Sequence, residues 1–127
     1  MKKTKKYLKE LLLPKKQFVF SYGNIINPKA TVPVFRTSFP IIASVFIKGY
    51  RLILKQAPNA KNGYHNIICT YTGNEEDIIP GFLTKVPKNL LPLMDMWEGA
   101  NYQRQDVVCY TRFLEPINCQ MYLLNQE

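Results

Sequence analysis

The sequence predicts an α+β fold, a small mixed or antiparallel β-barrel with short peripheral helices. About six stretches are rich in β-branched and aromatic residues and are bounded by turn signals. Only one stretch has convincing helical periodicity, and strands do not alternate regularly with helices as they do in parallel α/β folds. A chain of 127 residues that is 46% hydrophobic is the right size for one such domain.

The first sixteen residues form a basic leader. Residues 1–16 contain seven lysines and one glutamate, a net charge of +6, whereas residues 17–127 contribute only +2 to the total of +8. Tyr and Leu residues recur at helical spacing between Tyr7 and Leu12, so a short amphipathic helix that ends near Pro14 is expected. This helix either docks on the body or contacts nucleic acid or a membrane surface. Docking is favoured, because nothing in the nearly neutral body supports such a contact.

The first half of the body is predicted to be mostly strand. Residues 17–22 form a β-rich run that ends in a turn at Gly23. Residues 27–40 contain three prolines, so any helix there must be short or irregular. Residues 41–55 are either one long bent strand or two short strands divided at Gly49.

The second half contains the remaining strands and the one clear helix. Leu91, Met94 and Trp97 share one helical face, Pro92 is acceptable if the helix starts beside it, and Gly99 provides a C-terminal stop. The strand at 78–86 is expected to bulge at Pro80-Gly81. The further strands are predicted at residues 64–71, 78–86, 105–113 and 119–124.

The cysteine and histidine content excludes several kinds of site. Cys69, Cys109 and Cys119 are odd in number and have no metal-like spacing, and the only histidine is His65, so disulfides and a metal site are not expected. Cys109 and Cys119 are interpreted as small core residues. The chain has no apolar run long enough to cross a bilayer and its start lacks the apolar core of a secretory signal, so a cytoplasmic protein is expected.

Several short motifs follow one another in an order and spacing that make a chance match improbable. Together they resemble the gamma-glutamyl cyclotransferase-like family, in its branch similar to a plant avirulence-induced protein, over nearly all of residues 17–127. They are residues 18–25 (FVFSYGNI), 47–52 (IKGYRL), 63–67 (GYHNI), 80–86 (PGFLTKV), 93–99 (LMDMWEG) and 102–104 (YQR).

The resemblance implies a small barrel with a pocket at its mouth and an enzyme that needs no cofactor. Its implied reaction releases 5-oxoproline from a small gamma-glutamyl amine or peptide. The family's catalytic carboxylate falls on Glu98, and Tyr102 is a further candidate for contact with the substrate. The family's substrate-holding loop falls on Tyr22, Gly23, Asn24 and Ile25.

The reaction requires a base, because the attacking α-amine has an ordinary pKa of about 8 and is mostly protonated at neutral pH. Glu98 follows the apolar face of the predicted helix, where partial burial would raise the pKa of its carboxyl group. Backbone N–H groups around Gly23 could hold the tetrahedral oxyanion, since glycine has no side chain to block their approach.

The residues also allow other roles. Tyr22 and Tyr102 could simply be aromatic residues that pack on the barrel, and Arg104 could pair with Asp95. Asn24 stands where the family usually has Ser or Thr, and this difference in donors leaves open a larger gamma-glutamyl substrate. The alternative function is a non-catalytic module that binds a ligand in the pocket, while the Lys-rich leader recruits an acidic partner.

Overall fold

The computed structural model describes residues 15–22, 28–56 and 65–124. Within these residues the chain forms seven strands, two α-helices and one short 3-10 helix. The elements are β1 (Lys16–Ser21), α2 (Pro28–Phe35), β2 (Ile41–Lys48), β3 (Tyr50–Gln56), β4 (His65–Tyr71), β5 (Ile78–Pro87), η2 (Lys88–Leu90), α3 (Leu91–Glu98), β6 (Tyr102–Tyr110) and β7 (Pro116–Leu124).

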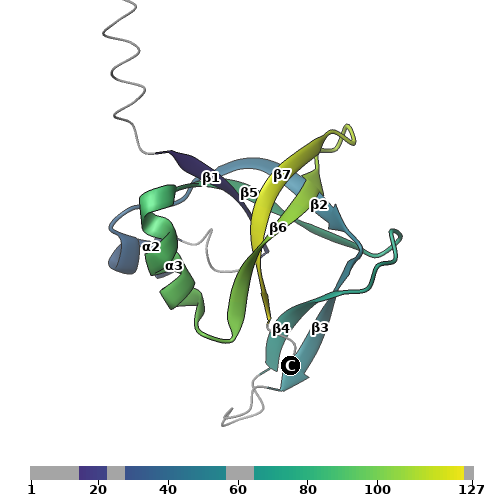
Figure 1. Cartoon of the computed structure of the whole chain (residues 1–127), viewed down its shortest axis with the longest axis horizontal. Helices are drawn as coiled ribbons and strands as arrows, with labels where there is room; N and C mark the ends of the chain where they lie inside the picture. The colour runs from purple at the N-terminus through teal and green to yellow at the C-terminus, as the bar shows by residue number, and fades with distance from the viewer. Residues whose placement is uncertain (1–14, 23–27, 57–64, 125–127) are drawn as a thin grey trace, which may run out of the picture.

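Five of the strands close into a barrel in the order β1-β5-β2-β6-β7. Consecutive strands in this order pair antiparallel, and the barrel closes where β1 meets β7 in a parallel pairing at Val19 and Gln120. The remaining strands, β3 and β4, form a separate hairpin beside the barrel (Figure 1). The expectation of a small mixed barrel with short peripheral helices is confirmed.

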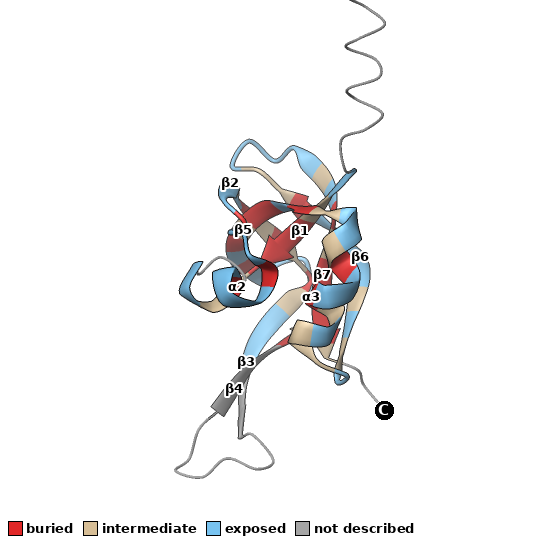
Figure 2. Ribbon diagram, turned by 90° about the vertical axis from the view of Figure 1, so that its left-hand side faces the viewer, coloured by how far each residue is buried: buried red, intermediate tan, exposed pale blue. Residues whose placement is uncertain are grey.

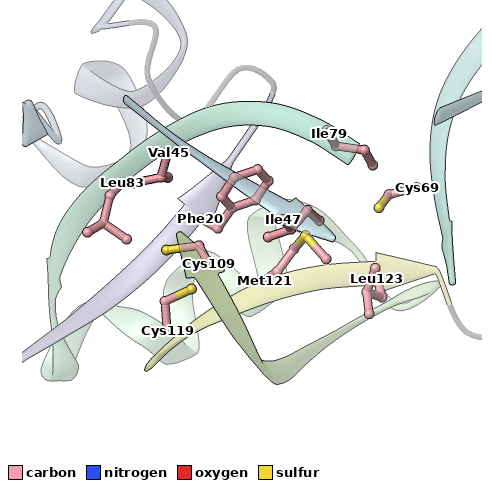
Figure 3. Close-up of a cluster of buried hydrophobic side chains, with 10 residues drawn as sticks. All are labelled: Phe20, Val45, Ile47, Cys69, Ile79, Leu83, Cys109, Cys119, Met121 and Leu123. Atoms are coloured by element: carbon pink, nitrogen blue, oxygen red, sulfur yellow. The ribbon is translucent and has the colours of Figure 1, made fainter. Parts of the chain in front are cut away.

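The barrel interior is filled by one large cluster of buried apolar side chains, drawn in Figure 3. Alternation along β2 and β7 puts every second side chain into this cluster, as the pleat of a strand requires. Cys109 and Cys119 lie in it on neighbouring strands, which confirms their interpretation as core residues. The cluster consists of Phe20, Val45, Ile47, Cys69, Ile79, Leu83, Cys109, Cys119, Met121 and Leu123.

A second buried cluster lies between the barrel and the two helices, which pack on the same side of the molecule (Figure 1). Buried residues line the barrel and the sides of α2 and α3 that turn toward it (Figure 2). α2 contains Pro33 and is only eight residues long, as the prolines of this segment predict. The cluster consists of Val19, Phe35, Phe39, Val86, Leu91, Met94 and Tyr122.

Strand β5 runs past Phe20 with no room for a side chain at Gly81. A Cβ atom there would lie 2.7 Å from the carbonyl oxygen of Ser21 and closer still to the Phe20 ring. The expected bulge at Pro80-Gly81 is wrong, because both residues pair regularly with β2. The register shift lies on β2 between Ile41 and Ala43. Gly81 is therefore needed for close packing of β1 on β5 rather than for a bulge.

Most of the predicted element boundaries are confirmed. Gly49, with a φ angle of 85°, divides β2 from β3, so the segment forms two strands. β6 begins at Tyr102, three residues earlier than expected, and ends before a turn in which Leu114 has a φ of 62°. β7 starts at Pro116, because the segment before Cys119 already pairs with β6.

The predicted leader helix lies outside the described residues, and of residues 1–16 only Lys15 and Lys16 are described. Among the described residues, no helix has the length and apolar character needed to cross a membrane.

Candidate functional site

Glu98 is the last residue of α3, which is fixed firmly on the barrel. Leu91 and Met94 are buried beneath the helix, and Trp97 packs edge-to-face on Phe35 with ring centroids 5.7 Å apart. Gly99 ends the helix with a φ of 102°, and its N–H donates to the carbonyl oxygen of Asp95 at 3.2 Å. This conformation is favourable only for glycine, so the helix stops directly after Glu98.

The carboxyl group of Glu98 is partly removed from water. Burial raises the pKa of Glu98 above its ordinary value, because the charged form loses solvation. The Glu98 charge in turn helps to raise the pKa values of Tyr22 and Tyr122. These effects place Glu98, Tyr22 and Tyr122 in one electrostatic neighbourhood.

Tyr22 and Tyr102 belong to the same neighbourhood. Burial is the main cause that raises the pKa of Tyr22, and the charges of Cys69, Tyr102 and Glu98 add to it, while a backbone hydrogen bond from Cys69 opposes it. The Tyr22 hydroxyl therefore keeps its proton at neutral pH and can donate a hydrogen bond. The structure thus brings three sequence-predicted residues together: Tyr22 at the end of β1, Glu98 at the end of α3 and Tyr102 at the start of β6.

Both tyrosines also pack on the body of the protein. Tyr22 packs against the cluster inside the barrel and Tyr102 against the cluster beneath the helices. Each ring is only partly buried, so packing leaves part of the side chain accessible. Gly23, Asn24 and Ile25, which follow Tyr22 in the chain, lie outside the described residues.

Asp95, one helical turn before Glu98, anchors α3 to the neighbouring strands. Arg104 donates from Nε to Oδ1 at 3.0 Å and from Nη2 to Oδ2 at 3.2 Å, and the Tyr122 hydroxyl donates to Oδ1 at 2.5 Å. Arg104 and Tyr122 are cross-strand partners on β6 and β7, so one register places both donors beneath the same carboxylate. The predicted pairing of Arg104 with Asp95 is confirmed.

The contacts of Arg104 continue along the barrel wall. Its Nη1 donates to Gln120 Oε1 at 2.8 Å, and Gln120 Nε2 donates to Asp106 Oδ1 at 3.0 Å. Gln120 is also the residue through which β7 pairs with β1. The anchor of α3 is thereby connected to the place where the barrel closes, directly beside the residues that precede Tyr22.

Two residues of this neighbourhood, Tyr122 and Cys69, could not be assigned to it from the sequence. Tyr122 lies in a strand that the sequence predicts only as core, and its contact with Asp95 spans 27 residues. Cys69 is buried, and this burial raises the pKa of its thiol to about 12, which keeps it protonated and unreactive at neutral pH. Among the described residues, no group of His, Cys, Asp and Glu side chains could hold a metal ion.

Comparison with known proteins identifies the family and the fold. The family model described as Gamma-glutamyl cyclotransferase, AIG2-like, matches residues 19–127. No curated protein matches the sequence. A solved structure titled "Gamma-glutamyl cyclotransferase" superposes with a TM-score of 0.69 at 20% identity, covering 88% of this chain and 68% of that chain.

Two further solved structures share the fold. An uncharacterized protein from Homo sapiens superposes with a TM-score of 0.68 at 21% identity, covering 87% of this chain and 68% of its own. An AIG2-like protein from Mus musculus superposes with a TM-score of 0.61 at 15% identity, covering 88% of this chain and 79% of its own. The family match covers the barrel except the first three residues of β1 and supports a gamma-glutamyl cyclotransferase-like enzyme function; the chain belongs to the gamma-glutamyl cyclotransferase, AIG2-like family.

Proposed function

We propose that this protein releases 5-oxoproline from a small gamma-glutamyl amine or peptide, with Glu98 as general acid and base. The observation that carries the proposal is a partly buried carboxyl group with a raised pKa, held at the end of a fixed helix beside Tyr22 and Tyr102. A base with a raised pKa takes a proton from an ammonium group more readily than an ordinary carboxylate does.

The proposed reaction is an intramolecular acyl transfer. Glu98 takes a proton from the substrate's α-amine, and the free amine attacks the γ-carbonyl of the same molecule. A bond from nitrogen to the γ-carbon forms, that nitrogen gives up a second proton to become the lactam N–H, and the bond from the γ-carbon to the leaving nitrogen breaks. Both protons pass to the leaving nitrogen, the first by way of Glu98, so the amine departs in its protonated form. Atoms and charge balance without water or a cofactor, and the products are 5-oxoproline and the amine.

Orientation supplies much of the rate enhancement in this proposal. Because both reacting groups belong to one molecule, holding the folded conformer contributes part of the roughly 7–11 kcal/mol that orientation can provide. The protonated Tyr22 hydroxyl and Tyr102 are assigned to substrate contact. Gly23, Asn24 and Ile25 are assigned to the oxyanion and the substrate carboxylate, as the family resemblance implies.

The test is 5-oxoproline release from a panel of gamma-glutamyl amines and dipeptides, measured by mass spectrometry. We expect wild-type protein to convert at least one panel member and Glu98→Gln to lose about 10²–10⁴-fold in kcat, the usual contribution of a general base. Glu76→Gln, which removes an exposed carboxylate in the turn before β5, is the matched control and should retain wild-type activity. Equal activity of wild type and Glu98→Gln would remove Glu98 from the mechanism.

A further inference from the structure

The outer wall of the barrel carries an apolar row that does not belong to the site around Glu98. Strand register places Pro80 of β5 beside Phe46 of β2, Phe46 beside Tyr110 of β6, and Tyr110 beside Pro116 of β7. The two prolines are exposed and the two aromatic rings are only half-buried, so all four face outward. In Figure 1 the helices cover the opposite side of the barrel from β2.

A surface hollow of about 430 Å³ lies beside this row. Its walls include Phe46, Pro80 and Phe82, and Arg112 also lines it. The lining is almost entirely apolar, and the volume lies in the lower part of the range of about 300–1,000 Å³ that is typical of ligand pockets. The hollow therefore suits one large apolar group that comes with a negative charge nearby.

Two cations flank the row. The Phe46 and Tyr110 rings stack with centroids 5.7 Å apart, and Lys48 Nζ lies 4.7 Å from the centroid of the Tyr110 ring. Within the described parts of the chain the ion pairs are Arg51–Asp77 and Arg104–Asp95, so neither Lys48 nor Arg112 is neutralised by a carboxylate. Unneutralised cations on both sides of an apolar row favour a partner with acidic groups.

The order of these groups across the surface suits an extended peptide. Lys48 follows Phe46 by two residues, and Arg112 follows Tyr110 by two residues on the antiparallel neighbour, so the cations lie on opposite sides of the aromatic pair. Lys48 ends β2 and its Nζ lies over the Tyr110 ring, whereas Arg112 lies in the turn after β6 and lines the hollow. In an extended peptide, side chains at positions i, i+2 and i+4 share one face, so an apolar side chain can have an acidic side chain on each side of it.

We propose that this outer-wall surface, formed by Phe46, Pro80, Phe82, Tyr110, Lys48 and Arg112, binds an extended acidic segment of a partner protein. One large apolar side chain of the segment enters the hollow, and carboxylates two residues before and after it meet the two cations. Glu75 lines a second hollow together with Lys48. A carboxylate of the bound segment that approaches Lys48 is therefore also repelled by the negative charge of Glu75. Arg112 therefore makes the larger contribution.

A peptide fits this surface better than a nucleic acid does. Single-stranded nucleic acid is held by a basic groove that follows many phosphates. The six residues of the outer-wall surface include only two cations, and the hollow that Arg112 lines is apolar. Neither hollow is lined by Glu98, Tyr22 or Tyr102, so the inference does not depend on the proposed enzymatic reaction.

The test uses the full chain and a fluorescein-labelled peptide, Gly-Glu-Ser-Phe-Ser-Glu-Gly, followed by fluorescence anisotropy at low and raised ionic strength. We expect saturable binding that weakens with salt and that falls about threefold to tenfold in Arg112→Glu. Lys88→Glu makes the same charge change at an exposed position on η2 and should bind as wild type does. A peptide with Lys in place of both Glu residues should not bind.

Three results would overturn the proposal. They are no saturable binding of the acidic peptide, an equal loss of affinity in Lys88→Glu and Arg112→Glu, and tighter binding of an oligouridine than of the peptide with the same dependence on Arg112. The lysine-substituted peptide tests the charge requirement with unaltered protein, so the outcome does not depend on how well the Arg112→Glu variant folds.

Discussion

The burial that suits Glu98 to its proposed role as general base also lowers the stability of the folded protein at neutral pH. Its pKa is raised from the ordinary value of 4.5 by burial, so the folded protein holds a proton there more readily than the unfolded chain does. The contribution of Glu98 to the free energy of unfolding is therefore most favourable below the unfolded pKa. It is lost as the pH rises through the folded pKa.

The stability of Glu98→Gln should show this effect. Glutamine does not ionise, so the variant lacks the loss of stability that Glu98 causes as the pH rises above about 4.5. The free energy of unfolding of the variant minus that of wild type should therefore be larger at neutral pH than at mildly acidic pH, by up to about 1 kcal/mol. Urea unfolding at the two pH values measures this gain. The same stability difference at both pH values would show that the Glu98 carboxyl group has no raised pKa in the folded protein.

Of the two side chains that bind Asp95, the sequence could suggest one but not the other. The spacing of Asp95 and Arg104 was enough to suggest their ion pair, because both fall in short motifs close together in the chain. The Tyr122 hydroxyl could not be added to this pair, since its position depends on the register between β6 and β7. Such long-range register is set by packing, and no local pattern encodes it.

At the scale of elements, α3 has to be held at a fixed angle for Glu98 to face Tyr22 and Tyr102. Removing one hydrogen bond to Asp95 in Tyr122→Phe should lower the free energy of unfolding by about 0.5–1.5 kcal/mol. We also expect kcat for 5-oxoproline release to fall about threefold to tenfold with little change in KM, because a looser helix positions the proposed base less well.

The control for this prediction is Tyr71→Phe, which removes a hydroxyl from an exposed ring on β4. It should leave both kcat and stability close to wild type. A Tyr122→Phe variant that is less stable but has an unchanged kcat would show that the hydroxyl only supports the fold.

The close packing of β1 on its neighbour β5 depends on Gly81. A methyl group at this position would meet the Phe20 ring and the Ser21 carbonyl oxygen, and the backbone atom cannot move aside as a flexible side chain can. We expect Gly81→Ala to lower the free energy of unfolding by about 1–3 kcal/mol, measured by urea unfolding. Gly99→Ala would not share this steric cause, since a Cβ there has no neighbour within 4 Å. A fully stable Gly81→Ala would mean that the two strands can separate slightly at no cost.

The strands and the helix were largely predictable, because period-2 runs, Gly49 and Gly99 are local signals. The error at Pro80-Gly81 has a specific physical reason. A Pro-Gly pair in a strand indicates either a bulge or a close approach of another chain segment, and only the position of Phe20 decides between them.

At the scale of the whole molecule, the barrel closes by pairing Val19 near the chain's beginning with Gln120 near its end. The sequence predicted that the strands would curl into a barrel, but the strand order could not be read from it. Closure places the end of β1, and therefore Tyr22, within reach of Glu98 and Tyr102. The order of the family motifs along the chain was enough to select Tyr22, Glu98 and Tyr102 as candidates. That the three lie in one neighbourhood follows only from the closed topology of the barrel.

None of the residues assigned to the reaction belongs to the basic leader, residues 1–16. Because Tyr22, Glu98 and Tyr102 all lie in the body, we expect a chain that lacks residues 1–14 to keep 5-oxoproline release within about twofold of the full chain. Steady-state kcat/KM measures this for both chains. A large loss of kcat/KM with retained folding would give the leader a part in the enzyme's site, and salt-sensitive binding of nucleic acid that needs the leader would favour the alternative function.

The most direct test of the account is a crystal structure of the protein with 5-oxoproline bound. The lactam nitrogen of this product is the former attacking amine, so its position reports where the proton is transferred. We expect the nitrogen within about 2.6–3.2 Å of the Glu98 carboxyl group, with Tyr22 in contact with the product. Product bound with its nitrogen turned away from Glu98, or bound only on the outer wall, would contradict the proposed role of Glu98.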